Sequence, residues 1–84
     1  MSYSIRIKAS AAKSLARIDK AQRTRLIAAI DRLADNPHAG SALKGEFKGL
    51  RRLRVGNYRI VYEVQVNEFV ILVVRAGHRR HVYA

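Results

Sequence analysis

The stretch LRRLRVGNYRIVYEVQV, residues 50–66, decides the fold of this chain. In residues 50–55 and 58–66, apolar residues rich in β-branched and aromatic types alternate with polar ones, which is typical of strands. Gly56-Asn57 lies between the two runs and favours a two-residue hairpin turn. This turn fixes which residues face each other: Leu53 faces Ile60, and Arg54 faces Arg59. In the same register Val55 faces Tyr58, and Arg52 faces Val61.

The hairpin register separates apolar and basic side chains onto opposite faces. Like charges directly opposite each other destabilise a sheet, yet the register brings three arginines to one face. Between Glu46 and Glu63 there is no acidic residue, and the basic residues there are Lys48, Arg51, Arg52, Arg54 and Arg59. The hairpin therefore predicts a surface that binds an external polyanion. A solvated surface that only maintains solubility is the simpler alternative.

Upstream of the hairpin, the pattern predicts one strand and two helices. Tyr3, Ile5 and Ile7 alternate with polar residues, as in a half-buried strand. Residues 9–19 then change to a helical period, with Ser10 as the expected N-cap. A second helix follows, ended by residues 35–37, and its apolar stripe is Leu26, Ile27, Ile30, Leu33 and Ala34.

Downstream, residues 38–49 read as a loop, residues 69–74 as a central strand buried on both faces, and residues 75–84 as a short basic tail. The resulting order is βααβββ. It predicts an α+β fold in which a two-helix hairpin packs on a mainly antiparallel four-stranded sheet. We expect residues 1–84 to form a single domain.

Composition narrows the possible partners. The 84 residues carry 17 Lys and Arg against 6 Asp and Glu, a net charge of +11. Such a charge attracts nucleic acid or an acidic protein. There is no cysteine, no glycine-rich phosphate loop and no acidic cluster for a metal ion, so we expect no metal and no cofactor. The longest apolar run is too short to span a bilayer, and a cytoplasmic protein without membrane contact is expected.

The end of the chain gathers groups that suit RNA chemistry. Arginine binds phosphate through its planar fork, tyrosine stacks on bases, and histidine exchanges protons near neutral pH. All three types occur together in Arg75, His78, Arg79, Arg80, His81 and Tyr83. A frayed, solvated terminus is the alternative. Ser10 and Ser14 lack a neighbouring base and are not expected to be nucleophiles, and Tyr58 and Tyr62 are expected to pack in the core.

Two motifs in this order resemble the RelE/ParE toxin superfamily, most closely its RelE branch. One is Gly56-Asn57-Tyr58-Arg59 followed by two aliphatic residues and Tyr62. The other is the ending Gly77-His78-Arg79 followed three residues later by Tyr83. The resemblance covers essentially the whole chain, including the order of elements.

The resemblance implies the toxin of a type II toxin–antitoxin system, an mRNA interferase that cleaves messenger RNA in the ribosomal A site. Such endoribonucleases use the 2′-hydroxyl as nucleophile and need no metal. The implied catalytic residues are Arg52, Arg59, Arg79, His81 and Tyr83. The implied RNA-binding residues are Lys44, Lys48, Arg51, Arg54, Arg75, His78 and Arg80. Relatives often carry lysine at the position of Arg52 and an acidic residue at the position of His81, so the general base remains open between His81 and His78.

The resemblance also implies partners: a small antitoxin, forming a hetero-oligomer, together with the ribosome and mRNA. From the charge, we expect the toxin-binding segment of the antitoxin to be acidic and amphipathic. Two alternatives stay open. One is a ParE-like inhibitor of DNA gyrase, and the other is a catalytically inactive homologue that acts only as the antitoxin's partner.

Overall fold

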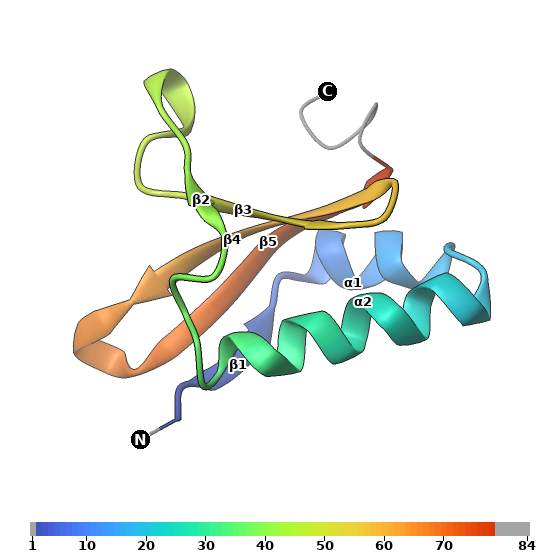
Figure 1. The fold of residues 1–84 in the computed structure, drawn as a ribbon, viewed down its shortest axis with the longest axis horizontal. Helices are drawn as coiled ribbons and strands as arrows, with labels where there is room; N and C mark the ends of the chain where they lie inside the picture. Colours follow the sequence, from blue (N-terminus) through green and yellow to red (C-terminus); the bar gives the residue numbers. More distant parts are fainter. Residues whose placement is uncertain (1, 79–84) are drawn as a thin grey trace.

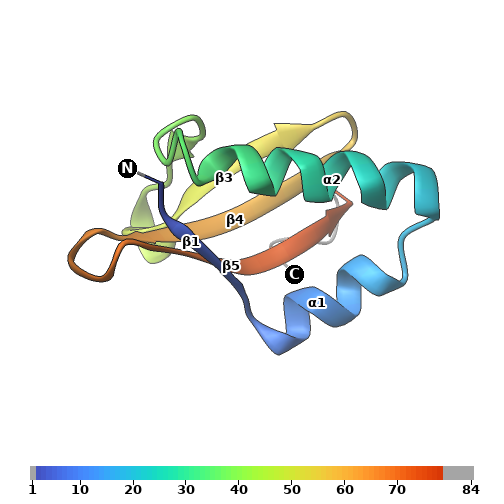
Figure 2. The same cartoon turned by 90° about the horizontal axis from the view of Figure 1, so that it is seen from below.

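Two helices cover one face of a five-stranded sheet (Figures 1 and 2). The computed structural model describes residues 2–78. The strands are β1 (Ser4–Ile7), β2 (Ser41–Ala42), β3 (Arg51–Val55), β4 (Tyr58–Gln65) and β5 (Val70–His78), and the helices are α1 (Ala9–Ala16) and α2 (Lys20–Leu33). The strand order is β1-β5-β4-β3-β2, with β1 parallel to β5 and every other pair antiparallel. The predicted α+β fold is confirmed.

The predicted hairpin register is confirmed residue by residue. Leu53 pairs with Ile60, Arg54 with Arg59, and Val55 with Tyr58. Gly56 has a φ of 60°, in the left-handed region that favours glycine, whereas Asn57 has no positive φ. This combination is typical of a type II′ turn, whose twist matches that of the flanking strands.

The sheet has one strand more than predicted, because part of the expected loop pairs with β3. Ser41 lies opposite Arg52 in the short strand β2. The preceding loop is held in place by Tyr62, whose buried hydroxyl donates to the Pro37 carbonyl (2.8 Å) and accepts from the Gly40 amide (3.0 Å). A Cβ at Gly40 would lie 2.3 Å from the Arg52 carbonyl oxygen, so only glycine allows this approach.

Helix starts and buried stripes differ from prediction in detail. The prediction of Ser10 as N-cap is wrong, since α1 begins at Ala9 and its N-cap position is Lys8. Asp19 caps α2 and separates the two helices, its side chain accepting from the Gln22 amide at 3.4 Å. The predicted stripe on α2 is largely confirmed, with Leu26, Ala29, Ile30 and Leu33 buried, but Ile27 is 43% exposed.

Strand β5 is longer than the predicted strand at residues 69–74. It begins at Val70, because Phe69 has a left-handed φ of 54°, and continues through Arg75 to His78. The prediction that the basic tail begins at residue 75 is therefore wrong. A bulge in the β4–β5 pairing, next to Val61 and Tyr62, lets the strand continue. Burial on both faces holds only in part, since the helices cover one face of the sheet: Ile71 and Val73 are fully buried, whereas Leu72 and Val74 are half-buried.

Candidate functional site

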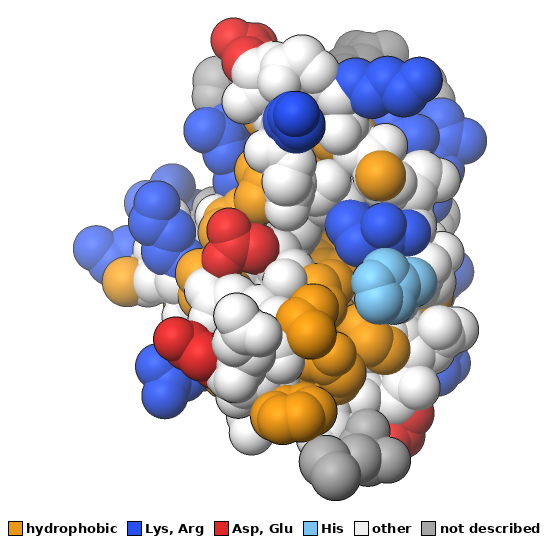
Figure 3. Space-filling model, turned by 90° about the vertical axis from the view of Figure 1, so that its left-hand side faces the viewer, with side chains coloured by type: hydrophobic (Ala, Val, Ile, Leu, Met, Phe, Trp, Pro, Cys, Tyr) orange, Lys and Arg blue, Asp and Glu red, His pale blue; other side chains and the backbone are white. Residues whose placement is uncertain are grey.

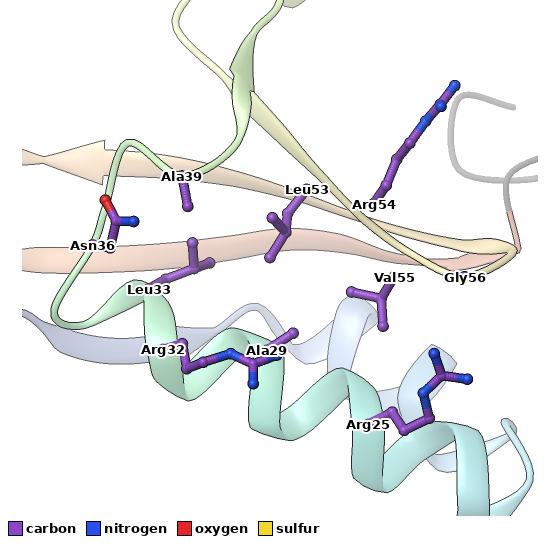
Figure 4. A pocket seen from close by; sticks show the side chains of 10 residues that line it. All are labelled: Arg25, Ala29, Arg32, Leu33, Asn36, Ala39, Leu53, Arg54, Val55 and Gly56. Carbon is purple, nitrogen blue, oxygen red and sulfur yellow. The ribbon is translucent and has the colours of Figure 1, made fainter.

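The face of the sheet away from the helices carries a cluster of arginines. Side chains alternate between the two faces of a strand. Because Leu53 and Val55 point toward the helices, Arg52 and Arg54 point away from them, and Figure 4 shows this for Arg54. The same alternation places Arg59 on β4 and Arg75 on β5 on the outer side. We call this surface, formed by Arg52, Arg54, Arg59, Val61 and Arg75, the basic face.

The register arranges the basic face in two rows across three strands. In one row Arg54 lies opposite Arg59, which lies opposite Gly77 on β5. In the next row Arg52 and Arg75 lie on either side of Val61, which is only 1% exposed. Neighbouring strands are about 4.8 Å apart, so the four cations share an area on the order of 10 Å across. Their potentials therefore add over one small surface.

The described residues supply little negative charge to the basic face. Within residues 2–78, no carboxylate forms an ion pair with Arg52, Arg54 or Arg59. Glu63 follows Val61 on the same side of β4, where its carboxylate accepts a hydrogen bond from Gln65 Nε2 at 2.7 Å. Arg54 and Arg75 are exposed, and Arg52 and Arg59 are half-buried. The surface is therefore able to bind an external anion such as phosphate.

Lys44 and Lys48 flank the single-turn helix Gly45–Phe47 and are exposed. Figure 1 shows that the loop between β2 and β3 rises on the side of the sheet away from the helices. These two predicted RNA-binding lysines therefore extend the positive charge beyond the basic face.

The structure places two other predicted RNA-binding residues on the helix side of the sheet. The guanidinium of Arg51 donates to the carbonyls of His38 (3.2 Å) and Gly40, and its Nε is buried without a partner among the described residues. His78 lies opposite Tyr58, with the two rings edge to face at 5.8 Å. Neither residue belongs to the basic face. The remaining predicted site residues, Arg79, Arg80, His81 and Tyr83, lie outside the described residues.

One feature of the helix side was not predicted. A groove of about 390 Å³ runs between α2 and β3 (Figure 4). Its lining includes two arginines from α2, Arg25 and Arg32, above an apolar floor. The sequence signal was the spacing of Arg25, Ala29 and Arg32, which places all three on one helix face.

The end of the sheet at the β4–β5 turn is apolar. Val66 and Phe69 are 57% and 49% exposed, and the Phe69 ring lies 5.7 Å from that of Tyr3. Figure 3 shows apolar side chains gathered at this end of the molecule. This end offers apolar contacts and is separate from the basic face.

The described residues show neither a metal cluster nor a membrane helix. In residues 2–78, no three His, Cys, Asp or Glu side chains come together in a group able to hold a metal ion. No helix in that range is long and apolar enough to cross a membrane.

Comparison with known proteins gives a consistent result. Residues 5–83 match the family model described as the ParE toxin of the type II toxin–antitoxin system parDE. A curated Escherichia coli protein, named as a RelE-like toxin protein, is 30% identical over an 84-position alignment that covers 94% of this chain and 85% of that protein.

Solved structures show the same fold. The RelE–RelB complex from Pyrococcus horikoshii includes a chain 29% identical to this one, with a TM-score of 0.77 over 96% of this chain and 99% of that one. A chain of the RelBE2 toxin–antitoxin complex from Mycobacterium tuberculosis is 22% identical, with a TM-score of 0.89 over 94% of this chain and 100% of that one.

Proposed function

Because this chain belongs to the ParE toxin family, within the RelE/ParE superfamily of type II toxin–antitoxin toxins, we propose that it is a metal-independent endoribonuclease that cuts mRNA on the ribosome. The supporting observation is the basic face, in which Arg54 lies directly opposite Arg59 and neither has a carboxylate partner in residues 2–78. We propose that residues 1–84 form one toxin domain that acts in the cytoplasm on ribosome-bound mRNA and pairs with an antitoxin.

The proposed reaction is attack by a 2′-oxygen on the adjacent phosphorus. The new bond joins the 2′-oxygen to phosphorus, and the bond from phosphorus to the 5′-oxygen of the next nucleotide breaks. Negative charge builds on the phosphoryl oxygens in the transition state, and fixed cations stabilise it. We assign this role to Arg59 and Arg79, while Arg52 and Arg54 hold the flanking phosphates.

Proton transfer needs a different group, because an arginine stays protonated in proteins. The base must accept the 2′-hydroxyl proton, and an acid must protonate the leaving 5′-oxygen. His78 contacts Tyr58 on the helix side of the sheet, so we assign the base to His81. Tyr83 is the proposed group for stacking on a base or for returning the proton.

A second candidate function is inhibition of DNA gyrase by binding. The observation that favours it is the family model, whose description is that of the ParE toxin. A basic face also suits binding to an acidic surface of a protein target, without cleavage of RNA.

The test is primer extension on a reporter mRNA in a purified translation system, followed by a supercoiling assay with gyrase. We expect cuts phased to the A-site codon with the wild-type protein, loss of those cuts with Arg59→Gln, and normal cuts with Lys13→Gln, which removes a cation from α1. Loss of supercoiling without any cuts would reject the nuclease in favour of gyrase inhibition. Cuts on naked RNA would reject the dependence on the ribosome.

A further inference from the structure

A hollow of about 470 Å³ lies on the helix side of the sheet, between the α1–α2 connection and the last residues of β5, and we call it the α1–β5 hollow. Figure 2 shows the end of β5 pointing into the angle between the two helices. The volume falls within the range of roughly 300–1,000 Å³ that is usual for small-molecule sites. The lining combines two rings, Tyr58 and His78, with two charged side chains, Arg17 and Asp19.

The two rings form a corner. Tyr58 and His78 lie opposite each other on β4 and β5, with ring centroids 5.8 Å apart and ring planes inclined by 80°. Both residues are half-buried. Because the planes are nearly perpendicular, a flat ring that stacks on one of them meets the edge of the other, and both arrangements are favourable between aromatic groups. The hollow therefore suits a planar aromatic ligand.

Two side chains of opposite charge lie beside the rings. Arg17 is the C-cap residue of α1, and Asp19 is the N-cap residue of α2. Both are exposed, and neither forms an ion pair within residues 2–78. Asp19 Oδ2 accepts from the Gln22 amide at 3.4 Å, which leaves most acceptor sites of the carboxylate open. The hollow therefore presents a fork of donors next to a set of acceptors.

The connection between the helices holds this charged pair in place. Only residues 17–19 separate α1 from α2. Arg23 Nη1 donates to the carbonyls of Ala16 (3.2 Å) and Ile18 (3.3 Å), so a guanidinium of α2 ties the connection to that helix. The backbone that carries the two charges is therefore fixed before a ligand arrives, which lowers the entropy cost of binding.

We propose that the α1–β5 hollow binds a guanine base, which stacks in the corner formed by Tyr58 and His78. The Asp19 carboxylate accepts from N1–H and the 2-amino group of the base. Arg17 donates to O6 and N7, the pairing that arginine commonly makes with guanine. The base belongs to a single-stranded RNA or to a free nucleotide. The RNA source rests on the proposed function, whereas the recognition of guanine rests on the hollow itself.

The charged pair selects guanine over the other bases. Guanine presents two adjacent N–H donors to a carboxylate, beside the acceptors that suit an arginine. Adenine and cytosine carry a ring acceptor next to their amino group, and uracil has a carbonyl on each side of its N–H. Each of these would turn a lone pair toward Asp19. An acidic peptide would be repelled by the same carboxylate, and an apolar ligand would leave both charges without partners.

The α1–β5 hollow lies across the sheet from the basic face. Gly77, which lines the hollow, lies opposite Arg59, and Tyr58 precedes Arg59 on β4. Neighbouring residues of a strand direct their side chains to opposite faces. An RNA strand with phosphates on the basic face would therefore reach the hollow by passing round this end of the sheet.

The first experiment measures, by calorimetry, the preference of the full-length protein for guanine. One arm compares GMP with AMP, and the other compares a short 2′-O-methyl RNA of adenines with the same RNA containing one guanine. The net charge of +11 attracts the phosphates of each pair equally. We expect a preference for guanine of roughly tenfold or more. A preference in the RNA arm alone assigns the base to RNA, and one in the GMP arm alone assigns it to a free nucleotide. No preference in either arm would overturn the proposal.

Asp19→Asn tests the edge contact and keeps the helix cap, because asparagine and aspartate are equally good N-caps. The variant should bind the guanine ligand roughly tenfold more weakly or worse. It should bind xanthosine monophosphate more tightly than GMP, since the new amide donates to the 2-carbonyl of xanthine. Asp31→Asn removes the same charge at an exposed position of α2 outside the hollow, and should change affinity by about twofold or less. Equal losses in the two variants, or a guanine preference that survives Asp19→Asn, would refute the proposal.

Stacking is tested by two substitutions of Tyr58, with circular dichroism as the check on folding. Tyr58→Phe keeps the ring and should change affinity by about twofold or less. Tyr58→Leu removes the ring and should weaken guanine and adenine ligands alike, by roughly fivefold or more. Full affinity of the folded leucine variant would refute stacking in the hollow.

These readouts do not depend on cleavage, because a 2′-O-methyl group blocks the nucleophile and GMP has no bond to cut. A protein that cuts mRNA but shows no preference for guanine would refute only the α1–β5 site. A protein that prefers guanine but cuts no mRNA would refute only the nuclease and would leave the guanine site supported.

Discussion

The directly opposed pair Arg54 and Arg59 predicts a conflict between stability and function. The Leu50 carbonyl accepts from the Leu43 amide, so residues 50, 52 and 54 direct their backbone groups away from β4. Arg54 and Arg59 therefore form a non-hydrogen-bonded pair, the type in which opposite side chains approach most closely. Like charges in such a position destabilise a sheet by roughly 0.2–1 kcal/mol. Arg54→Gln should therefore raise the free energy of unfolding by about that amount. Arg59→Gln should raise the free energy of unfolding by a smaller amount, because the substitution also removes the packing of the half-buried aliphatic part of the arginine. It should also abolish RNA cleavage.

The repulsion itself is isolated by a double-mutant cycle. Once one arginine is gone, removing the other relieves no further repulsion between them. The gain from Arg54→Gln should thus be smaller in the Arg59→Gln background, with a coupling of about 0.2–1 kcal/mol. For a domain of this size such a difference corresponds to roughly 1–8 °C in Tm.

The assay is urea unfolding of the four proteins, since urea leaves ionic strength unchanged. A cycle of Arg54→Gln with Lys13→Gln serves as the control, because Lys13 lies on α1, across the sheet, and should show no coupling. The coupling in the arginine cycle should shrink at high salt as screening shortens the range of the repulsion. Zero coupling at low salt, or a coupling that favours the pair, would refute the reasoning.

Three further variants test the supports of the site. Tyr62→Phe removes the hydroxyl that bridges Pro37 and Gly40, and should cost about 1–3 kcal/mol in urea unfolding because the Gly40 amide loses its partner. Gly40→Ala forces a Cβ against the Arg52 carbonyl, and should lower stability by about 1–3 kcal/mol and reduce cleavage by displacing that strand edge; unchanged activity would contradict this coupling. Arg51→Met should lower Tm yet leave cleavage per folded molecule unchanged, and a loss equal to that of Arg59→Gln would instead place Arg51 among the RNA contacts.

The local parts of the fold could be predicted from the sequence because they depend on short-range chemistry. Gly56-Asn57 defines the turn, and the turn defines every pairing between β3 and β4. The positions of Arg52, Arg54 and Arg59 on one face follow directly. The positions of these three arginines could therefore be predicted from the sequence alone.

The missed parts depend on long-range contacts. Strand β2 exists because Tyr62 holds Pro37 and Gly40, residues more than twenty positions away in the chain. Arg51 was predicted to bind RNA, but its guanidinium donates to the carbonyls of His38 and Gly40 instead. The local sequence around Arg51 does not predict these contacts. The groove between α2 and β3 likewise depends on how the helix and the strand pack together.

The uneven charge of the chain links the basic face to the stability of the fold. In residues 2–78, no carboxylate forms an ion pair with Arg52, Arg54 or Arg59 of the basic face. Self-repulsion of this kind destabilises a compact state, and a domain of 84 residues has only a few kcal/mol of stability to lose. Any acidic ligand that binds only the folded chain adds stability that grows with its concentration above Kd. An acidic partner that covers the basic face would therefore stabilise the fold and occupy its arginines in the same step, so protection of the chain and blockage of the basic face would rise together with the concentration of that partner.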